Sequence, residues 1–365
     1  VYHEARKASY AVPRDPRVKS DVVIPWGDEG DAVEGDVVRV RITGHGPRRR
    51  GTVGEVVEVL GRLGDPGVDV LSVLHDHGLA PDFPPEVEAE ARSISEGRRP
   101  GGSGDEEVRA EDRAAGSGAA ENDREDLRHI RTMTIDPADA KDHDDALSVE
   151  RLDGGRMRIG IHIADVGWYV QPGTELDTEA RQRGTSVYLV DRVVPMLPHT
   201  LSSDLCSLRP DEDRYAVSLL VDVDAAGRVE GHRFARTLVR SRHRLAYEEV
   251  QAVLDGAQSV DAEADEDIRT LATVARALRT VKGARGALDF DLPEARVRLD
   301  DDGEPVAIER VVRLEAHRLV EDFMLLANEI VASEGVRRSL PVLYRVHETP
   351  ASDRLEKLRE MLARF

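Results

Sequence analysis

Cysteine and long apolar runs are scarce in this sequence. Cys206 is the only cysteine among 365 residues, which excludes a disulfide framework and a zinc site built from cysteines. Its apolar setting, LCSL, predicts a buried and reduced thiol. No apolar run approaches the roughly 18 residues that span a membrane, and the N-terminus does not resemble a signal peptide. We therefore expect a cytoplasmic protein without membrane contact.

Lysine and net positive charge are scarce as well. The formal net charge is −20, which argues against a nucleic-acid partner but does not exclude one, because net charge can hide a local basic patch. Nearly all of the 51 basic residues are arginines; the lysines are Lys7, Lys19, Lys141, Lys282 and Lys357. Arginine is the better bidentate ligand of phosphate, although a codon-biased genome explains the same preference.

The first 62 residues predict a small β-barrel. Residues 21–25, 35–42 and 51–60 have the pattern of short strands separated by turns that contain Gly and Asp. Short strands at this spacing favour an OB-type fold. Such barrels often bind single-stranded nucleic acid by aromatic stacking and cationic grooves, for which this barrel offers Tyr2, Tyr10, Trp26, Arg48, Arg49 and Arg50. A purely structural barrel with a solvated basic turn explains these residues equally well.

Two changes of composition divide the remaining chain. Residues 63–95 combine prolines with two short helical patterns and predict a helical connecting segment. Residues 96–127 are acidic and rich in Gly, Ser and Ala, which is typical of a flexible linker. Apolar periodicity returns at Arg131 and continues to the end of the sequence, with segments that have the pattern of strands and others that have the pattern of helices.

Two of these segments have the clearest periodicity. Residues 156–166 alternate as a strand does, which places on one face Met157, Ile159, Ile161 and Ile163. Residues 314–334 form the strongest helical pattern, with an apolar stripe of Leu319, Phe323, Leu326, Ile330 and Val331.

An aspartate cluster lies between two apolar strands of this part of the chain. The stretch TIDPADAKDHDDA carries Asp136, Asp142, Asp144 and Asp145. Carboxylates this close repel one another unless cations or protons neutralise them, and oxygen ligands at this density suit Mg²⁺ or Mn²⁺. An acidic surface loop is one alternative. A calcium-binding EF-hand fails, because its sixth and twelfth positions would be Leu147 and Asp153. A two-metal phosphoryl-transfer site explains the acids best.

The aspartate stretch resembles the signature of the ribonuclease II and ribonuclease R family. Four further blocks resemble the family's catalytic RNB domain, in the family's order: IHIADVGWYVQPGTELDTEARQRGTSVYL, VVPMLPHTLSSDLCSLRPDEDR, LEAHRLVEDFMLLAN and LYRVHETP. Residues 20–95 resemble the cold-shock-like OB region that precedes it. The blocks are most similar to the ribonuclease R branch. The resemblance thus implies an α+β RNB domain at 128–365, incomplete at its C-terminus, behind a cold-shock-like barrel at 1–62.

The family resemblance implies an activity and a cofactor. The expected enzyme is a hydrolase of the exoribonuclease II class, which degrades RNA processively from single-stranded 3′ ends to 5′ nucleoside monophosphates. It would need Mg²⁺ or Mn²⁺ and is expected to be a monomer. A non-catalytic RNA-binding regulator on an RNB scaffold is the main alternative, and an endonuclease or phosphatase that uses the same metals is another.

Seven residues carry the implied site. The resemblance assigns metal ligation to Asp136, Asp142, Asp144 and Asp145, with Asp142 and above all Asp144 in catalysis. It assigns RNA contacts to Tyr188, which would stack near the 3′-terminal nucleotide, to Phe290, which would clamp the other end of the base stack, and to Glu321, near the terminal ribose. Taken alone, Tyr188 fits a core strand and Glu321 a solvated helix acid.

The sequence also departs from the family pattern. The catalytic arginine expected downstream in an RRY-type block, the C-terminal OB domain and the basic tail are absent, as is the first cold-shock domain. The chain starts at Val1 and stops inside a helical pattern at Phe365. We therefore expect a fragment with little or no nuclease activity of its own.

Overall fold

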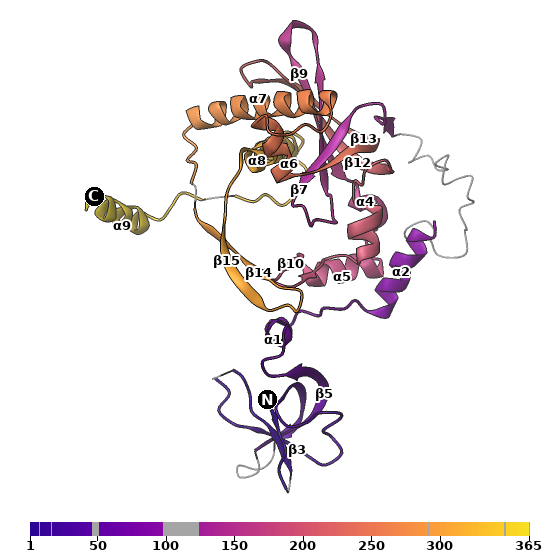
Figure 1. Ribbon diagram of the computed structural model, residues 1–365, viewed down its shortest axis with the longest axis vertical. Coiled ribbons are helices and arrows are strands. Elements are labelled where there is room, and N and C mark those ends of the chain that lie inside the picture. Colours follow the sequence, from indigo (N-terminus) through magenta and orange to yellow (C-terminus); the bar gives the residue numbers. More distant parts are fainter. Residues whose placement is uncertain are drawn as a thin grey trace.

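A computed structural model describes residues 1–6, 8–15, 17–45, 51–97, 124–290, 292–346 and 348–364. The predicted linker at 96–127 lies mostly outside these residues, and the arginine turn at 48–50 lies wholly outside them. A small N-terminal sheet stands at one end of the molecule, and a larger body of sheet and helices forms the rest (Figure 1). None of the described helices combines the length and apolarity that crossing a bilayer requires.

The N-terminal unit is a five-stranded sheet in the order β1–β2–β3–β5–β4. Its strands are β1 (Tyr2–His3), β2 (Ser9–Ala11), β3 (Val22–Ile24), β4 (Asp36–His45) and β5 (Thr52–Arg62). The two edge strands meet where Gly35 N donates to Tyr2 O at 3.0 Å, as in a small barrel. Tyr2 belongs to the core of this unit, whereas Trp26 is 74% exposed.

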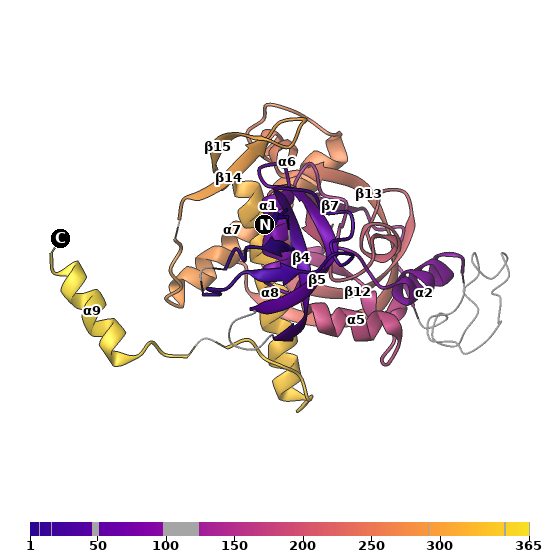
Figure 2. The same cartoon turned by 90° about the horizontal axis from the view of Figure 1, so that it is seen from below.

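The segment predicted as a connection contributes a helix to the larger body. It contains α1 (Val68–Asp76) and α2 (Pro85–Ser95). The buried face of α2 is part of the same apolar cluster as Leu176 and Leu201, and Leu176 N donates to Glu90 Oε2 at 2.9 Å. Helix α2 is therefore packed into the body and does more than connect (Figure 2).

The body is built on a six-stranded sheet in the order β12–β9–β8–β7–β13–β6. The strands are β6 (Glu125–Asp126), β7 (Thr132–Asp136), β8 (Asp145–Arg151), β9 (Met157–Ala164), β12 (Asp213–Val223) and β13 (Val229–Ala246). Residues 229–240 of β13 pair antiparallel with β12, and residues 241–246 pair parallel with β7. Because the long strand bridges both, the sheet closes on itself.

Helices cover both faces of this sheet. One face packs on α6 (Tyr247–Leu254), α7 (Ala262–Ala284) and α8 (Glu315–Arg337). The other packs on α2, α4 (Val166–Tyr169), α5 (Glu175–Arg183) and the π-helix η2 (Leu201–Leu205). Figure 1 shows the sheet between these two groups. Strand residues alternate between the two clusters, as Ala146 and Leu147 do.

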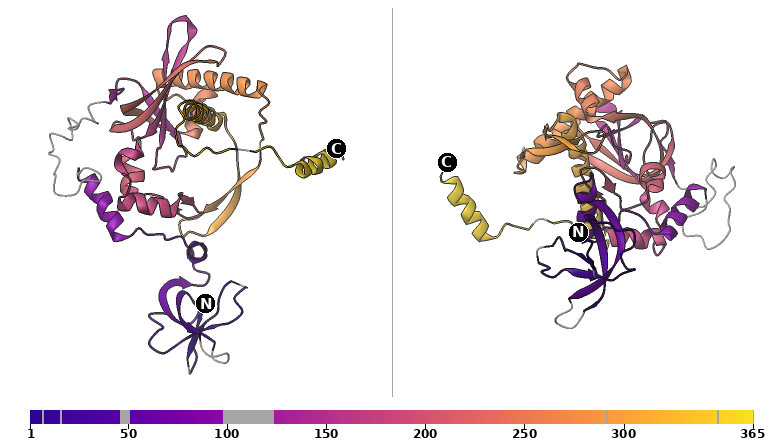
Figure 3. Two further views of the ribbon diagram at one scale, coloured as in Figure 1. Left: turned by 180° about the vertical axis from the view of Figure 1, so that it is seen from behind. Right: turned by 60° about the horizontal axis from the view of Figure 1, so that its bottom comes forward.

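Smaller elements make up the rest of the described structure. They are the 3-10 turn η1 (Asp153–Gly155), the hairpin β10 (Val187–Tyr188) and β11 (Val193–Val194), the hairpin β14 (Glu294–Leu299) and β15 (Pro305–Val311), and α9 (Ser352–Leu362). Helix α9 has no buried residue and stands away from the body in both views of Figure 3. Cys206 is buried and free, as predicted, and burial raises the pKa of its thiol to about 12.

Two residues of the predicted apolar faces are exposed in the structure, so the prediction is wrong for them. Ile163 was expected to share the buried face of β9 but is 39% exposed, and Val331 of α8 is 54% exposed. Ile163 pairs with Asp145 at the end of the strand, beyond Ile159 and Ile161, which the helices cover. Periodicity gives the direction of a side chain but does not show how far a covering element extends.

A buried polar ladder crosses four strands of the sheet. His162 bonds Ser148 Oγ through Nε2 (2.9 Å) and Ser218 Oγ through Nδ1 (2.7 Å), and Ser218 bonds Thr237 Oγ1 (2.6 Å). The ladder leaves no space beside Gly160, where a Cβ would lie 2.3 Å from Ser148 Oγ. Burial lowers the pKa of His162 to about 4.

This ladder predicts an acid-sensitive stability. Below pH about 6.5 the unfolded chain protonates His162 and the folded chain does not, so the free energy of unfolding should fall as the pH drops from 6.5 to 4. The His162 contribution is about 3 kcal/mol over that window. Urea unfolding at several pH values would measure it, with His162→Gln as the comparison. Parallel pH profiles for the two proteins would contradict the prediction.

Candidate active site

The four aspartates lie where β7 and β8 separate. Asp136 ends β7 and Asp145 begins β8. The two strands pair only at Thr132–Ser148 and Met133–Leu147. The loop between them, which carries the remaining two acids, therefore lies at the open end of this strand pair.

Backbone contacts from a distant segment hold this loop in place. Ser207 Oγ accepts from His143 N at 3.0 Å and donates to Lys141 O at 3.0 Å. Leu208 N donates to His143 O, and Ala164 N donates to Asp144 O, both at 2.9 Å. The second half of the loop, which carries Asp142 and Asp144, thus follows a defined path to Asp145 at the start of β8.

His143 orients Asp136. Its Nδ1 lies 2.7 Å from Asp136 Oδ2, and both side chains are largely buried, at 3% and 15% exposed. The contact fixes one oxygen of this carboxylate. Sequence reasoning missed His143, whose only signal was its place inside a run of aspartates.

Electrostatic repulsion acts between the aspartates. Partial burial and then repulsion from Asp142 and Asp136 raise the pKa of Asp144 to about 6, although the residue keeps an accessible face. Burial and then repulsion from Asp136 and Asp144 raise the pKa of Asp145 to about 6. The four carboxylates are therefore close enough that their charges oppose the ionisation of Asp144 and Asp145.

This electrostatic strain fits a divalent cation. A hard cation would relieve the repulsion and stabilise the ionised carboxylates. The described residues contain no group of three or more His, Cys, Asp or Glu side chains already arranged around a metal position. Among the described residues, no arginine or lysine forms an ion pair with the four aspartates. Their one described ion pair joins Asp136 to His143.

Two tyrosines border the cluster. The hydroxyl of Tyr188 lies 3.5 Å from Asp142 Oδ2, and its side chain is 69% exposed. Burial, followed by Asp142 and Asp144, raises its pKa. Tyr188 is thus an accessible ring next to the acids and not the core residue that its strand pattern alone suggested. Tyr247, which sequence reasoning missed, lies near Asp136 and Asp145; burial and then these acids raise its pKa to about 12.

The other two predicted RNA contacts lie on the α8 side of the site. Phe290 is 67% exposed, and Glu321 is exposed and paired with Arg313. Among the described contacts, neither touches the aspartate loop directly. His317, one turn before Glu321 on α8, stacks on Tyr247 with ring centroids 4.1 Å apart. Since residues four apart share a helix face, Glu321 points to the same side as the ring beside the aspartates.

Comparison with known families shows to which protein family the chain belongs. The sequence model of the RNB domain matches residues 124–364, and that of the cold shock domain matches residues 10–84. The chain therefore belongs to the RNB family. Its mixed α/β body and its small N-terminal barrel are the fold that the sequence resemblance implied.

The most similar proteins include ribonuclease R from several bacteria. Ribonuclease R of Vibrio cholerae is 37% identical over 361 residues, which cover 97% of this chain and 41% of that protein. Ribonuclease R of Thermotoga maritima is 37% identical over 367 residues, covering 99% and 49%. The chain thus spans between about two fifths and one half of the length of these relatives.

Solved structures agree with this assignment. RNase R of Mycoplasma genitalium, in complex with ribose-methylated single-stranded RNA, superposes with a TM-score of 0.87 at 25% identity, covering 100% of this chain and 55% of that chain. Yeast Ssd1, described as a pseudonuclease, shares the fold with a TM-score of 0.68 at 16% identity over 99% of this chain and 44% of that chain. The fold therefore does not by itself establish nuclease activity.

Proposed function

We propose that this chain supplies the aspartate half of a 3′→5′ exoribonuclease centre, which hydrolyses single-stranded RNA stepwise to 5′ nucleoside monophosphates. The observation that carries the proposal is the clustering of four aspartates at the ends of β7 and β8 beside an exposed tyrosine, where burial and neighbouring acids raise the pKa values of Asp144 and Asp145. Membership of the RNB family and the likeness to ribonuclease R support it.

The aspartates and Tyr188 have different roles in this proposal. Asp136, held by His143, and Asp145 are the principal ligands of Mg²⁺ or Mn²⁺, and Asp142 and Asp144 complete the anionic site. When bound, the metal ions lower the pKa of the attacking water and offset the charge that develops on phosphate. Tyr188 offers a ring on which the terminal base stacks without regard to its identity. Such sequence tolerance suits an enzyme that degrades many RNAs.

An RNA-binding regulator on the same fold remains the second candidate, because a pseudonuclease has this architecture. The retained aspartates favour hydrolysis. A regulator gains nothing from four acids whose mutual repulsion opposes folding and disfavours an RNA phosphate.

The products of a 5′-labelled RNA with a single-stranded 3′ tail test the proposal. The protein expressed from its complete reading frame should shorten the RNA one nucleotide at a time when Mg²⁺ is supplied, and should release monophosphates. Residues 1–365 alone should shorten it little or not at all, because no arginine or lysine of the described residues pairs with the aspartates and the developing phosphate charge needs a cation.

Three results would contradict these expectations. Internal cuts would favour an endonuclease, and tight binding without turnover in the protein from the complete reading frame would favour the regulator. Rapid trimming by residues 1–365 would show that the described half of the site suffices.

A further inference from the structure

Arg313 joins two segments that carry predicted RNA contacts. It lies between β15 and α8. Its Nη1 donates to Asp289 Oδ1 at 2.8 Å, and its Nη2 donates to Glu321 Oε2. The same Nη1 lies 3.5 Å from Phe290 O. One guanidinium therefore contacts Glu321 and both Phe290 and its neighbour.

The Phe290 segment has few other attachments. It runs between the end of α7 at Ala284 and the start of β14 at Glu294, and those of its residues that the structure describes form neither helix nor strand. Its large apolar side chains are mostly exposed: Leu288 at 78%, Phe290 at 67% and Leu292 at 77%. The described ion pairs of Asp289 are those with Arg313 and, at 3.4 Å, with Arg318. Arg313 is the closer of the two and the one that also reaches the Phe290 carbonyl.

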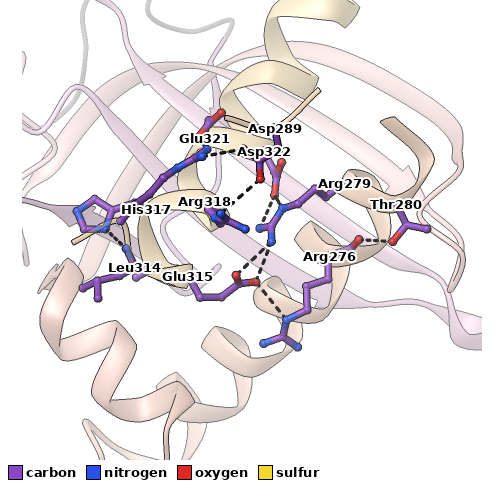
Figure 4. Close-up of polar contacts among 12 residues, drawn as sticks. Arg276, Arg279, Thr280, Asp289, Leu314, Glu315, His317, Arg318, Glu321 and Asp322 are labelled. Carbon is purple, nitrogen blue, oxygen red and sulfur yellow. Dashed lines mark hydrogen bonds and ion pairs between the residues drawn. The ribbon is translucent and has the colours of Figure 1, made fainter. Parts of the chain in front are cut away.

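Arg313 thus forms an ion-pair bridge between Asp289 and Glu321. The Glu321 end of this bridge lies on a well-packed helix. Figure 4 shows Glu321 and Asp322 side by side on α8, with Arg279 bound to Asp322 and Glu315 of that helix. Helix α8 is thus clamped to α7, and Glu321 is presented from a rigid element. One oxygen of Glu321 accepts from Arg313, and the other is not used in this contact.

The chemistry of the bridge requires a guanidinium. Its planar fork can donate from two nitrogens to two carboxylates at once, and it is always charged. A lysine at this position would keep the charge but, as a point donor, would not hold both carboxylates in a fixed relation.

We propose that Arg313 is a positioning residue that sets Phe290 and Glu321 at a fixed separation, so that the base stacked on Phe290, at one end of the stack, and the ribose hydroxyl of the terminal nucleotide, at the other end, are recognised together. The proposal rests on the proposed exoribonuclease function. It goes further in assigning discrimination between ribose and 2′-deoxyribose to the pair and not to Glu321 alone.

The bridge itself can be tested without RNA. Chymotryptic cleavage between residues 288 and 293, located by mass spectrometry, should be about tenfold faster in Arg313→Gln, because loss of a charged hydrogen bond raises local opening by about that factor. Arg310→Gln is the matched control, since Arg310 is exposed on β15 and has no described ion pair. Equal cleavage rates in both variants would show that Arg313 does not hold the Phe290 segment in place.

The functional arm uses the protein expressed from its complete reading frame. Turnover is compared for RNAs that end in a ribonucleotide or in a 2′-deoxyribonucleotide. The ratio of the ribonucleotide rate to the 2′-deoxyribonucleotide rate should fall about tenfold in Arg313→Gln and in Glu321→Gln. In the double variant this ratio should fall no further than in Glu321→Gln. Arg313→Lys should keep RNA affinity without restoring the ratio, and Arg310→Gln should leave it unchanged.

The outcomes separate the two proposals. An unchanged ratio in Arg313→Gln, or a loss that adds fully to that of Glu321→Gln, would overturn the positioning role. A wild-type protein that does not hydrolyse RNA from its 3′ end would overturn the proposed function, and the cleavage experiment would then still decide whether Arg313 fastens the Phe290 segment.

Discussion

Replacing Asp144 by Asn, in the protein expressed from its complete reading frame, should slow RNA hydrolysis about 10³-fold and leave RNA binding nearly intact. The carboxyl of Asp144 is accessible, and its pKa is raised to about 6 by partial burial and by Asp142 and Asp136. It is still mostly ionised at neutral pH. Asparagine has nearly the same shape but removes the negative charge, and losses of this size follow removal of single catalytic groups.

Asp139→Asn is the matched control for this experiment. Asp139 lies in the same loop, but it is exposed, and its one ion pair among the described residues is with Arg296 of β14. An exposed pair contributes little, so turnover should change less than about twofold. Single-turnover rates and RNA binding by fluorescence anisotropy would give both quantities. If Asp144→Asn retained normal turnover, the catalytic assignment would be wrong.

Replacing Arg124 by Ala should lower the free energy of unfolding by about 3–5 kcal/mol. The guanidinium is 3% exposed and lies 2.6 Å from Asp165 Oδ2, which is itself nearly buried. It also lies over the ring of Tyr215, 4.2 Å from the centroid, and 5.2 Å from that of Trp168. Alanine would leave a buried carboxylate without its partner and open a space between two aromatic rings.

Arg128→Ala provides the comparison for this stability measurement. Arg128 is 39% exposed and pairs with Asp126 and Asp213 at the surface, so its loss should cost about 1 kcal/mol or less. Denaturant unfolding followed by circular dichroism would measure both variants. Similar losses for Arg124→Ala and Arg128→Ala would show that the buried pair does not have the expected role.

Secondary structure could be predicted where periodicity is local. The helix expected over residues 314–334 coincides with most of α8, and the strands expected beside the aspartates and over residues 156–166 are β7, β8 and β9. The double pairing of β13 could not be predicted, because no local signal distinguishes a strand that changes partner partway along its length. Long-range pairing is decided by the packing of the whole sheet.

The candidate site was predictable only where its residues are close in sequence. Four aspartates within ten residues give a clear chemical signal. Ser207 holds the same loop from 64 residues away, and a serine in an apolar run has many ordinary roles. Tyr247 and Arg313 likewise reach the site through tertiary packing. The contacts of the seven predicted residues with metal ions and RNA stay predictions.

The packing of α2 defines the unit that can be exchanged between relatives. The RNB match begins at residue 124, yet the buried face of α2, Pro85–Ser95, belongs to the same core as Leu176 and Leu201. A chimaera joined at residue 124 would take Val87, Ala91 and Ile94 of that core from one parent and the rest of the core from another. The packed unit that carries the aspartates therefore begins before α2, and Arg183, which stacks on Phe83 at 3.7 Å, should be exchanged together with that helix.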